Sequence, residues 1–181
     1  MAKPETADLS RIIRQRRYQI LSRRGWISLG IRILILGLVF WLLFSQIFLV
    51  CQLQGNGMFP ALKDGDLLFG YRLQREYKND DVIIFEHNGK HCVGRVVARG
   101  GDYVDFDEEG KIFVNGGQQM GDILYPTYPK DGTQFPVQVP DSSLYVLGDY
   151  RTQTEDSRDF GPIPKEDIQA KLIGILRRRG L

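Results

Sequence analysis

The chain has 181 residues, a length that suits one domain with an appendage. Two histidines and two cysteines stand at unrelated spacings, and no Gly-rich phosphate loop is present, so we expect neither a metal site nor a cofactor. The net charge of +2 is small but unevenly distributed, because cations crowd the N-terminus at Lys3, Arg11, Arg14, Arg16, Arg17, Arg23, Arg24 and Arg32.

An apolar run follows this basic block from Ile33 to Cys51. At about 1.5 Å per residue the run spans roughly 28 Å, close to the hydrocarbon thickness of a bilayer. A cleaved signal peptide needs a shorter apolar core with small residues at its end, and Ile47–Val50 lacks them. A core helix is usually shorter and more amphipathic. We therefore expect an uncleaved single-pass anchor.

The basic flank before the run places the N-terminus in the cytoplasm by the positive-inside rule. We expect a basic cytoplasmic segment at residues 1–32, a transmembrane helix at 33–51 and an extracytoplasmic domain at 52–181 of a cell-membrane protein. The basic block is either a solvated tail or an interfacial helix on anionic lipid. Phosphate binders also cluster Arg and Lys, but the adjoining span explains this cluster, so we expect no nucleic-acid partner.

From Gln52 onward the pattern is one of short apolar or β-branched runs separated by Gly, Asn and Asp. A hairpin turn at Asp107–Lys111, a Pro-rich excursion at Tyr125–Pro140 and a short helix beginning at Pro164 interrupt them. Many short strands favour a mainly β fold, an antiparallel barrel or coiled sheet. The expected strands are Leu67–Tyr71, Asp81–Glu86, His91–Ala98, Tyr103–Asp107, Lys111–Val114, Leu144–Leu147 and Ala170–Leu176.

Four segments follow in order behind the anchor, at Gly57–Asp66, Asp81–Phe85, Val93–Asp102 and Leu147–Gly161. Together they resemble the motifs of type I signal peptidases, and the resemblance covers most of the chain. In the family pattern a glycine stands at position 80 and an asparagine and a serine at 150 and 154, so Asp80, Tyr150 and Thr154 are departures. The resemblance implies a mostly β domain resting on the membrane.

The resemblance also implies where the catalytic groups of the family should stand. Its nucleophilic serine directly precedes Met-x-Pro, where this chain has Gly57, and its general-base lysine directly precedes an arginine, where this chain has Gly94. A further serine hydroxyl that assists the oxyanion falls at Gly55. A Ser–Lys pair needs a hydroxyl, a neutral amine and oxyanion donors, so only the backbone N–H groups at Gly55 and Gly57 remain. We expect both dyad-equivalent glycines to face an open cleft.

Other positions take roles from the same resemblance. Leu53, Met58 and Val93 correspond to residues that line the family's apolar substrate cleft, although an ordinary core uses the same residue types. Thr154 matches the serine that orients the lysine. The remaining scaffold residues beside the site are Asp149, Asp156 and Arg158, for which a structural salt bridge is the favoured interpretation.

Cys92 is the one candidate for a replacement nucleophile, since it lies two residues before Gly94 on the same strand face. Its alternative is a small buried apolar residue, the usual state of a free cysteine. Whether Cys51 and Cys92 form a disulfide stays open at this point.

The resulting hypothesis is a membrane-anchored, signal-peptidase-like protein without peptidase chemistry. A dyad-lacking subset of the family occurs in streptococcal pilus gene clusters, which implies a chaperone or assembly function with pilin or other secreted precursors as clients and a sortase as a further candidate partner. Three alternatives remain: an active signal peptidase that uses Cys92, a regulator that binds signal peptides without cleaving them, and a chain whose glycines were introduced by engineering.

Overall fold

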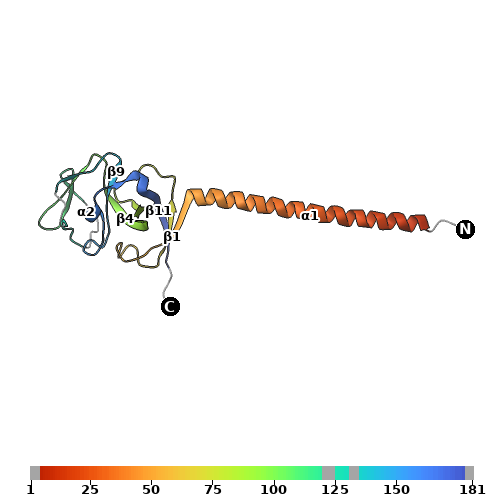
Figure 1. Ribbon diagram of the computed structural model, residues 1–181. Coiled ribbons are helices and arrows are strands. Elements are labelled where there is room, and N and C mark those ends of the chain that lie inside the picture. The colour runs from red at the N-terminus through yellow and green to blue at the C-terminus, as the bar shows by residue number, and fades with distance from the viewer. Residues whose placement is uncertain (1–4, 120–124, 131–134, 178–181) are drawn as a thin grey trace. The chain divides into compact units, whose positions relative to one another are not determined.

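A computed structural model describes residues 5–119, 125–130 and 135–177, with side chains from residue 25 onward. The chain forms two compact units, Met1–Ser45 and Gln46–Leu181. Nearly all of the first is one helix, and the second contains every strand, as the ribbon in Figure 1 shows.

Helix α1 runs from Glu5 to Ile47 and thus includes most of the basic block. Its last 23 residues, Gly25–Ile47, have a mean hydropathy of 2.4 and are long and apolar enough to cross a membrane. Large apolar side chains of this stretch are exposed, among them Trp26 at 72% and Leu34 at 70%. An N-terminal apolar helix of this length fits a single-pass membrane anchor.

The expected helical boundary at Cys51 is wrong by four residues, because α1 ends at Ile47 and strand β1 occupies Phe48–Gln52. Residues of β1 pair antiparallel with β2 (Leu67–Tyr71), from Phe48 opposite Tyr71 to Gln52 opposite Leu67. A short run of apolar residues has no period that separates helix from strand, so only this pairing decides the conformation.

The principal sheet has seven strands in the order β1-β2-β11-β3-β4-β9-β10, and every pairing in it is antiparallel. The mainly β prediction is therefore confirmed. The expected strands are present, one of them with the expected bounds and the others with boundaries shifted by one or two residues. Besides β1 and β2 the sheet contains β3 (Val82–His87), β4 (Lys90–Arg99), β9 (Ser143–Leu147), β10 (Ile163–Pro164) and β11 (Ile168–Leu176).

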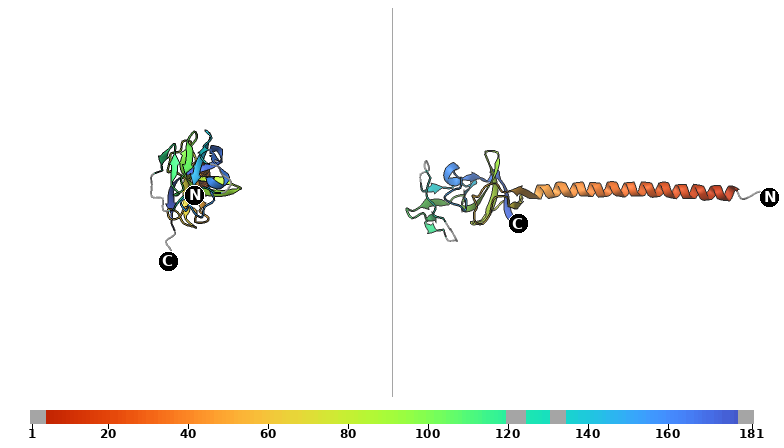
Figure 2. Two further views of the ribbon diagram at one scale, coloured as in Figure 1. Left: turned by 90° about the vertical axis from the view of Figure 1, so that its left-hand side faces the viewer. Right: turned by 90° about the horizontal axis from the view of Figure 1, so that it is seen from below.

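A second, four-stranded sheet in the order β7-β6-β5-β8 lies at the other end of the same unit, as the views in Figure 2 show. Its strands are β5 (Tyr103–Phe106), β6 (Ile112–Val114), β7 (Gly117–Gln118) and β8 (Val137–Gln138). Two short helical pieces complete the fold, α2 (Ser157–Phe160) and the 3₁₀ turn η1 (Lys165–Asp167), which is the short helix expected after Pro164.

Three apolar clusters form the core, and β4 separates two of them. Cluster 1 contains Ile83, Phe85, Val96 and Val146, with Cys92 packed against it. Cluster 3 contains Leu53, Met58, Leu62, Leu68, Ile84 and Ala170, with Val93 packed against it. Because neighbouring residues of a strand point to opposite faces, Cys92 and Val93 reach different clusters. Cluster 2, around Tyr145 and Leu147, joins the two sheets.

Candidate functional site

Gly57 lies half-buried in the loop between β1 and β2, where polar contacts fix its carbonyl oxygen. The Tyr150 backbone N–H and the Thr154 hydroxyl both donate to this oxygen, each across 2.9 Å. A Cβ atom at Gly57 would stand 3.1 Å from Thr154 Cγ2 and 3.2 Å from its Oγ1. A side chain at this position therefore meets one threonine and needs only a small displacement of it.

Gly94 is buried in the middle of β4, opposite Ile83 of β3. A Cβ atom here would stand 2.4 Å from Val146 Cγ1, 3.3 Å from the Leu147 carbonyl oxygen and 3.6 Å from Phe85 Cε1. The expectation of an open cleft is wrong at this glycine, because a packed valine and a backbone oxygen occupy the space of a side chain. At Gly57 the space is tight but not closed.

Gly55 differs from both, since nothing lies within 4 Å of the position of a Cβ atom. Its φ of +88° strains any L side chain, which explains why glycine suits this turn. Its N–H donates to Asp64 Oδ1 across 2.7 Å. This N–H, expected to persist as part of an oxyanion site, is thus already engaged.

Both glycines that the resemblance places at the dyad lie against the end of β9 or the residue that follows it. Val146 and Leu147 border Gly94, and the next residue, Gly148, has so little room that a Cβ atom on it would stand 2.7 Å from the Gly57 carbonyl oxygen. The structure therefore brings together two segments that are far apart in the sequence.

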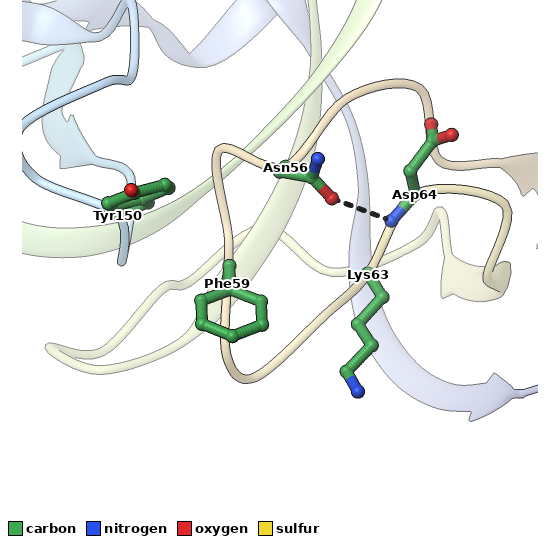
Figure 3. Close-up of a pocket in the computed structure, with 5 residues that line it drawn as sticks. All are labelled: Asn56, Phe59, Lys63, Asp64 and Tyr150. Carbon is green, nitrogen blue, oxygen red and sulfur yellow. Dashed lines mark hydrogen bonds between the residues drawn. The ribbon is translucent and has the colours of Figure 1, made fainter.

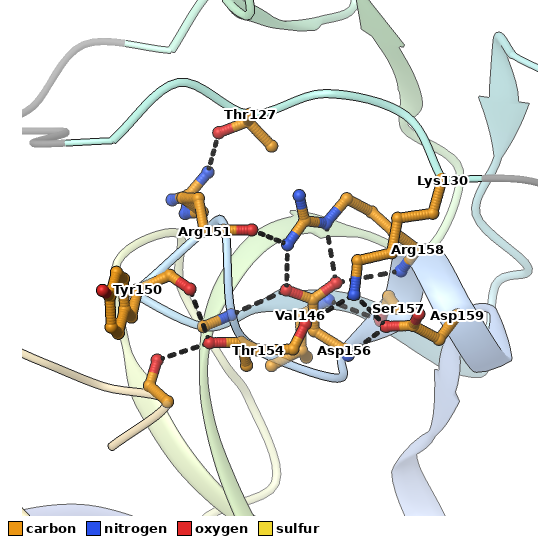
Figure 4. Close-up of polar contacts among 12 residues, drawn as sticks. Thr127, Lys130, Val146, Tyr150, Arg151, Thr154, Asp156, Ser157, Arg158 and Asp159 are labelled. Carbon is orange, nitrogen blue, oxygen red and sulfur yellow. Dashed lines mark hydrogen bonds and ion pairs between the residues drawn. The ribbon is translucent and has the colours of Figure 1, made fainter.

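The segment from Gly148 to Phe160 holds this arrangement with ion pairs (Figure 4). Asp156 and Arg158 form a buried pair with Arg158 Nη2 2.8 Å from Asp156 Oδ2, and both are at most 3% exposed. Asp156 also accepts the Gly148 N–H at 3.2 Å and caps α2. Asp149 pairs instead with Arg95 at 2.7 and 2.8 Å, which raises the pKa of Arg95.

A strap of six residues, Tyr125–Lys130, lies over this segment. Arg151 Nη1 donates to Thr127 Oγ1 at 2.9 Å, and Lys130 Nζ donates to the Thr154 carbonyl and to Asp159, each at 2.6 Å. Burial lowers the pKa of Arg151 to about 10. Nothing in the sequence marks Thr127, Lys130 or Arg151 as site residues, because the Pro-rich excursion carries no pattern that predicts where it folds back.

The expected cleft residues come together, but mostly as core. Leu53 is 7% exposed and Met58 is 1% exposed, both within cluster 3, and Val93 packs against them partly buried.

Cys92 is half-buried against cluster 1, and burial together with the nearby Glu155 carboxylate raises the pKa of its thiol. A raised pKa leaves less thiolate at neutral pH, which makes the sulfur a poor nucleophile. Cys51 is also a free thiol and packs against cluster 3, so the two cysteines are not paired. Within the described ranges, no group of His, Cys, Asp and Glu side chains is arranged to hold a metal ion.

An open groove of about 400 Å³ lies on the outer side of the Gly57 loop (Figure 3). Phe59 and Tyr150 form its aromatic part, with ring centroids 6.1 Å apart. Its polar lining comes from Asn56, Lys63 and Asp64. Phe59 lies in the Gly57–Asp66 segment and Tyr150 in the Leu147–Gly161 segment, and the groove arises only where these two segments meet.

Comparison with known proteins gives this site its context. The family model described as "Signal peptidase, peptidase S26" matches residues 24–176. The chain is 29% identical over 157 residues to signal peptidase I of Bacillus licheniformis, covering 79% of this chain and 82% of that protein. It is 28% identical over 138 residues to thylakoidal processing peptidase 1 of Arabidopsis thaliana, covering 67% of this chain but only 40% of that protein.

A solved signal peptidase I from Enterococcus faecalis V583 aligns with a TM-score of 0.46 and 23% sequence identity, over 55% of this chain and 98% of that one. The family match, by contrast, extends from the last part of the basic block to the end of β11, and so includes the anchor helix, Gly57, Gly94 and the ion-paired segment. The chain therefore belongs to the signal peptidase family, peptidase S26.

Proposed function

We propose that this chain is a non-catalytic member of the family, a membrane-anchored protein that binds secreted precursor polypeptides without cleaving them. The observation that carries the proposal is the filled space at residue 94, where Val146 Cγ1 stands 2.4 Å from the position of a Cβ atom. At residue 57 the space is tight but not closed, since Thr154 lies 3.1 Å from that position. A site that lost only its reactive groups would leave vacant room at both positions, whereas a core side chain occupies the room at residue 94.

Among the described residues, two strand edges beside Leu53 and Val93 have no paired strand, and this supports peptide binding. Residues Lys90–Val93 of β4 pair with β3 on one side, and pairing with β9 begins only at Arg95. Strand β1 stands at the edge of the sheet, and the residue after it, Leu53, packs in the same cluster as Val93. An extended peptide can add to such edges through backbone hydrogen bonds, with apolar side chains directed at Leu53 and Val93.

The anchor supports a location on the cell membrane with the N-terminus in the cytoplasm and the β unit outside, where exported precursors emerge. Pilin subunits are the client class that we favour, because the resemblance to the dyad-lacking subset points to pilus assembly, and a sortase is the enzyme expected to act on the same clients. This function is that of a chaperone or assembly factor.

The first test is a cleavage assay with the purified full chain in detergent and a secretory precursor carrying a small-x-small site. We expect no product under conditions where the Bacillus licheniformis signal peptidase I cleaves it. Turnover that disappears in Cys92→Ala would establish the alternative nucleophile, and turnover that persists in that variant would refute the proposal.

The second test measures binding of the same precursor segment as a synthetic peptide. We expect saturable binding, abolished when every second residue is N-methylated, because methylation removes the hydrogen bonds of strand addition. Equal binding of both peptides would contradict the strand-edge site. Co-purification with pilin or with a sortase from the native membrane then identifies the client and separates an assembly factor from a regulator of signal peptides.

A further inference from the structure

The loop that carries Gly57 has two faces with different surroundings. Met58 points into cluster 3 and is 1% exposed, whereas the next residue, Phe59, is 36% exposed and faces the groove. Phe59 begins a row of three rings, with centroids 6.1 Å from Phe59 to Tyr150 and 4.6 Å from Tyr150 to Tyr125 of the strap. The groove therefore lies on the other face of the Gly57 loop from cluster 3.

The polar lining of the groove offers donors, and the Asn56 amide oxygen and one Asp64 carboxylate oxygen already accept hydrogen bonds. Asn56 Oδ1 accepts the Asp64 N–H at 3.3 Å, which directs the amide nitrogen of Asn56 away from that contact, and Asp64 Oδ1 accepts the Gly55 N–H at 2.7 Å. Among the described residues, Asn56 Nδ2, Lys63 Nζ and the Tyr150 hydroxyl have no hydrogen-bond partner. Figure 3 shows these side chains around the loop, with Lys63 and Phe59 pointing the same way.

We propose that this groove binds a proline-rich polypeptide segment in the polyproline II conformation. Aromatic rings supply flat apolar faces for pyrrolidine rings, the mode by which aromatic-lined grooves bind Pro-rich chains. Such a ligand presents carbonyl acceptors all along its length and has no N–H at its prolines, so it requires donors and few acceptors. The free groups of Asn56, Lys63 and Tyr150 meet this requirement.

The same set of donors and acceptors argues against a glycan, another ligand class that stacks on aromatic rings. Sugar hydroxyls donate as well as accept, and their donors need free acceptor oxygens. In this groove the amide oxygen of Asn56 and one carboxylate oxygen of Asp64 are already used. The volume of about 400 Å³ lies in the range of ligand pockets and suits a few residues of an extended chain.

The proposal does not rest on the proposed function, because a groove beside the Gly57 loop can hold a ligand whether or not the protein cleaves precursors. The two also fail separately in experiment. A peptide made only of proline has no backbone N–H and cannot add as a β-strand, so its binding cannot arise from the strand edges of β1 and β4.

The test uses the full chain in detergent micelles and a fluorescein-labelled decaproline peptide, with anisotropy as the readout. We expect saturable binding that a labelled Gly-Ser decapeptide does not show. Tyr150→Ala and Phe59→Ala should each weaken binding about tenfold, the effect of removing an aromatic anchor. Lys63→Met should weaken it about fivefold through one lost hydrogen bond.

Tyr103→Ala is the matched control, since Tyr103 is a 49% exposed tyrosine on β5, outside the groove, and its loss should change nothing. Thermal melting checks that each variant folds. If an aromatic variant does not fold, Lys63→Met still tests the groove, because Lys63 is exposed and its replacement leaves the core intact. Absence of decaproline binding, equal binding by Lys63→Met and wild type, or displacement of decaproline by an N-acetylglucosamine trisaccharide would overturn the proposal.

Discussion

Gly57 and Gly94, the two positions where the resemblance places the family's dyad, have opposite kinds of surroundings. Polar contacts from residues 148–159 fix the Gly57 loop, through a threonine hydroxyl and a backbone N–H on one carbonyl. Apolar packing closes the space at Gly94, with a valine methyl at 2.4 Å from an ideal Cβ. Hydrogen bonds and an ion pair hold the surroundings of Gly57 in place, whereas tight apolar packing holds those of Gly94.

The two positions therefore differ in how much the structure must change to accept the side chain that a Ser–Lys pair needs. A threonine side chain at a half-buried loop can rotate to admit a serine. A valine within the core cannot move without leaving its cluster, because interiors are packed at nearly crystalline density. A neutral amine at residue 94 would therefore require a different β9, not one substitution.

The largest effect should come from breaking the ion pair that supports the Gly57 side. Arg158→Met leaves the Asp156 carboxylate buried without its partner, which we expect to lower the free energy of unfolding by about 3–5 kcal/mol. Denaturant unfolding of the full chain in detergent measures this change in the free energy of unfolding. Lys130→Met is the control: its pair with Asp159 is about one-third exposed on both sides, so its loss should cost at most about 1 kcal/mol. Equal effects of the two variants would contradict the assignment of Asp156–Arg158 as a buried support.

The next effect tests the packed side. Gly94→Ala forces a methyl group against Val146 and should destabilise by about 1–3 kcal/mol, as overpacking does. In a double-mutant cycle with Val146→Ala, which removes the contacting Cγ1, the two changes should couple favourably. Additive effects would mean that Val146 does not fill the site. Gly94→Lys should lower the free energy of unfolding more than Gly94→Ala does, because it also places an ammonium group in the core.

A smaller effect is expected at Gly57. In Gly57→Ser the new side chain contacts only the terminal atoms of the Thr154 side chain. The free energy of unfolding should therefore fall by less than about 1 kcal/mol, the lower end of the overpacking range. Thr154→Ser removes the contacting Cγ2 while keeping the hydroxyl on the Gly57 carbonyl, so the double variant should recover wild-type melting. A melting point lower than that of Gly94→Ala would reverse the comparison. Neither Gly57→Ser nor the combination with Gly94→Lys should cleave a precursor.

The smallest effect concerns pH and the far end of the Gly57 loop. Arg177 donates to Asp66 at 2.9 Å and lowers the pKa of this carboxyl. A lowered folded-state pKa contributes stability above the unfolded value, about 3.9, and loses it as the pH falls through the folded value. Arg177→Gln should therefore melt below wild type at neutral pH, and the difference should shrink under pH 4. A difference in melting temperature between Arg177→Gln and wild type that stays constant below pH 4 would show that Arg177 acts by packing alone.

Much of the fold could be predicted from the sequence. Strands such as Leu67–Tyr71 and Leu144–Leu147 are apolar or β-branched runs bounded by turn residues, and that local chemistry is enough to identify them. The anchor helix followed equally from its length and composition. Strand β1 did not, since Phe48–Val50 continues the apolar run and only pairing with β2 makes it a strand. Two-residue strands such as β7 carry too few residues for any pattern.

The sequence alone was enough to expect glycine where the family resemblance implies a hydroxyl and an amine, because the motifs around Gly57 and Gly94 specify those two positions. The side chains that surround the two glycines are known only from the assembled fold. Val146 and Thr154 are ordinary residues in their own segments, and nothing local marks them as neighbours of the two glycines. Their contacts arise where β9 and the segment after it pack against β4 and the Gly57 loop, and contact across such separations depends on the assembled sheet, not on local propensity.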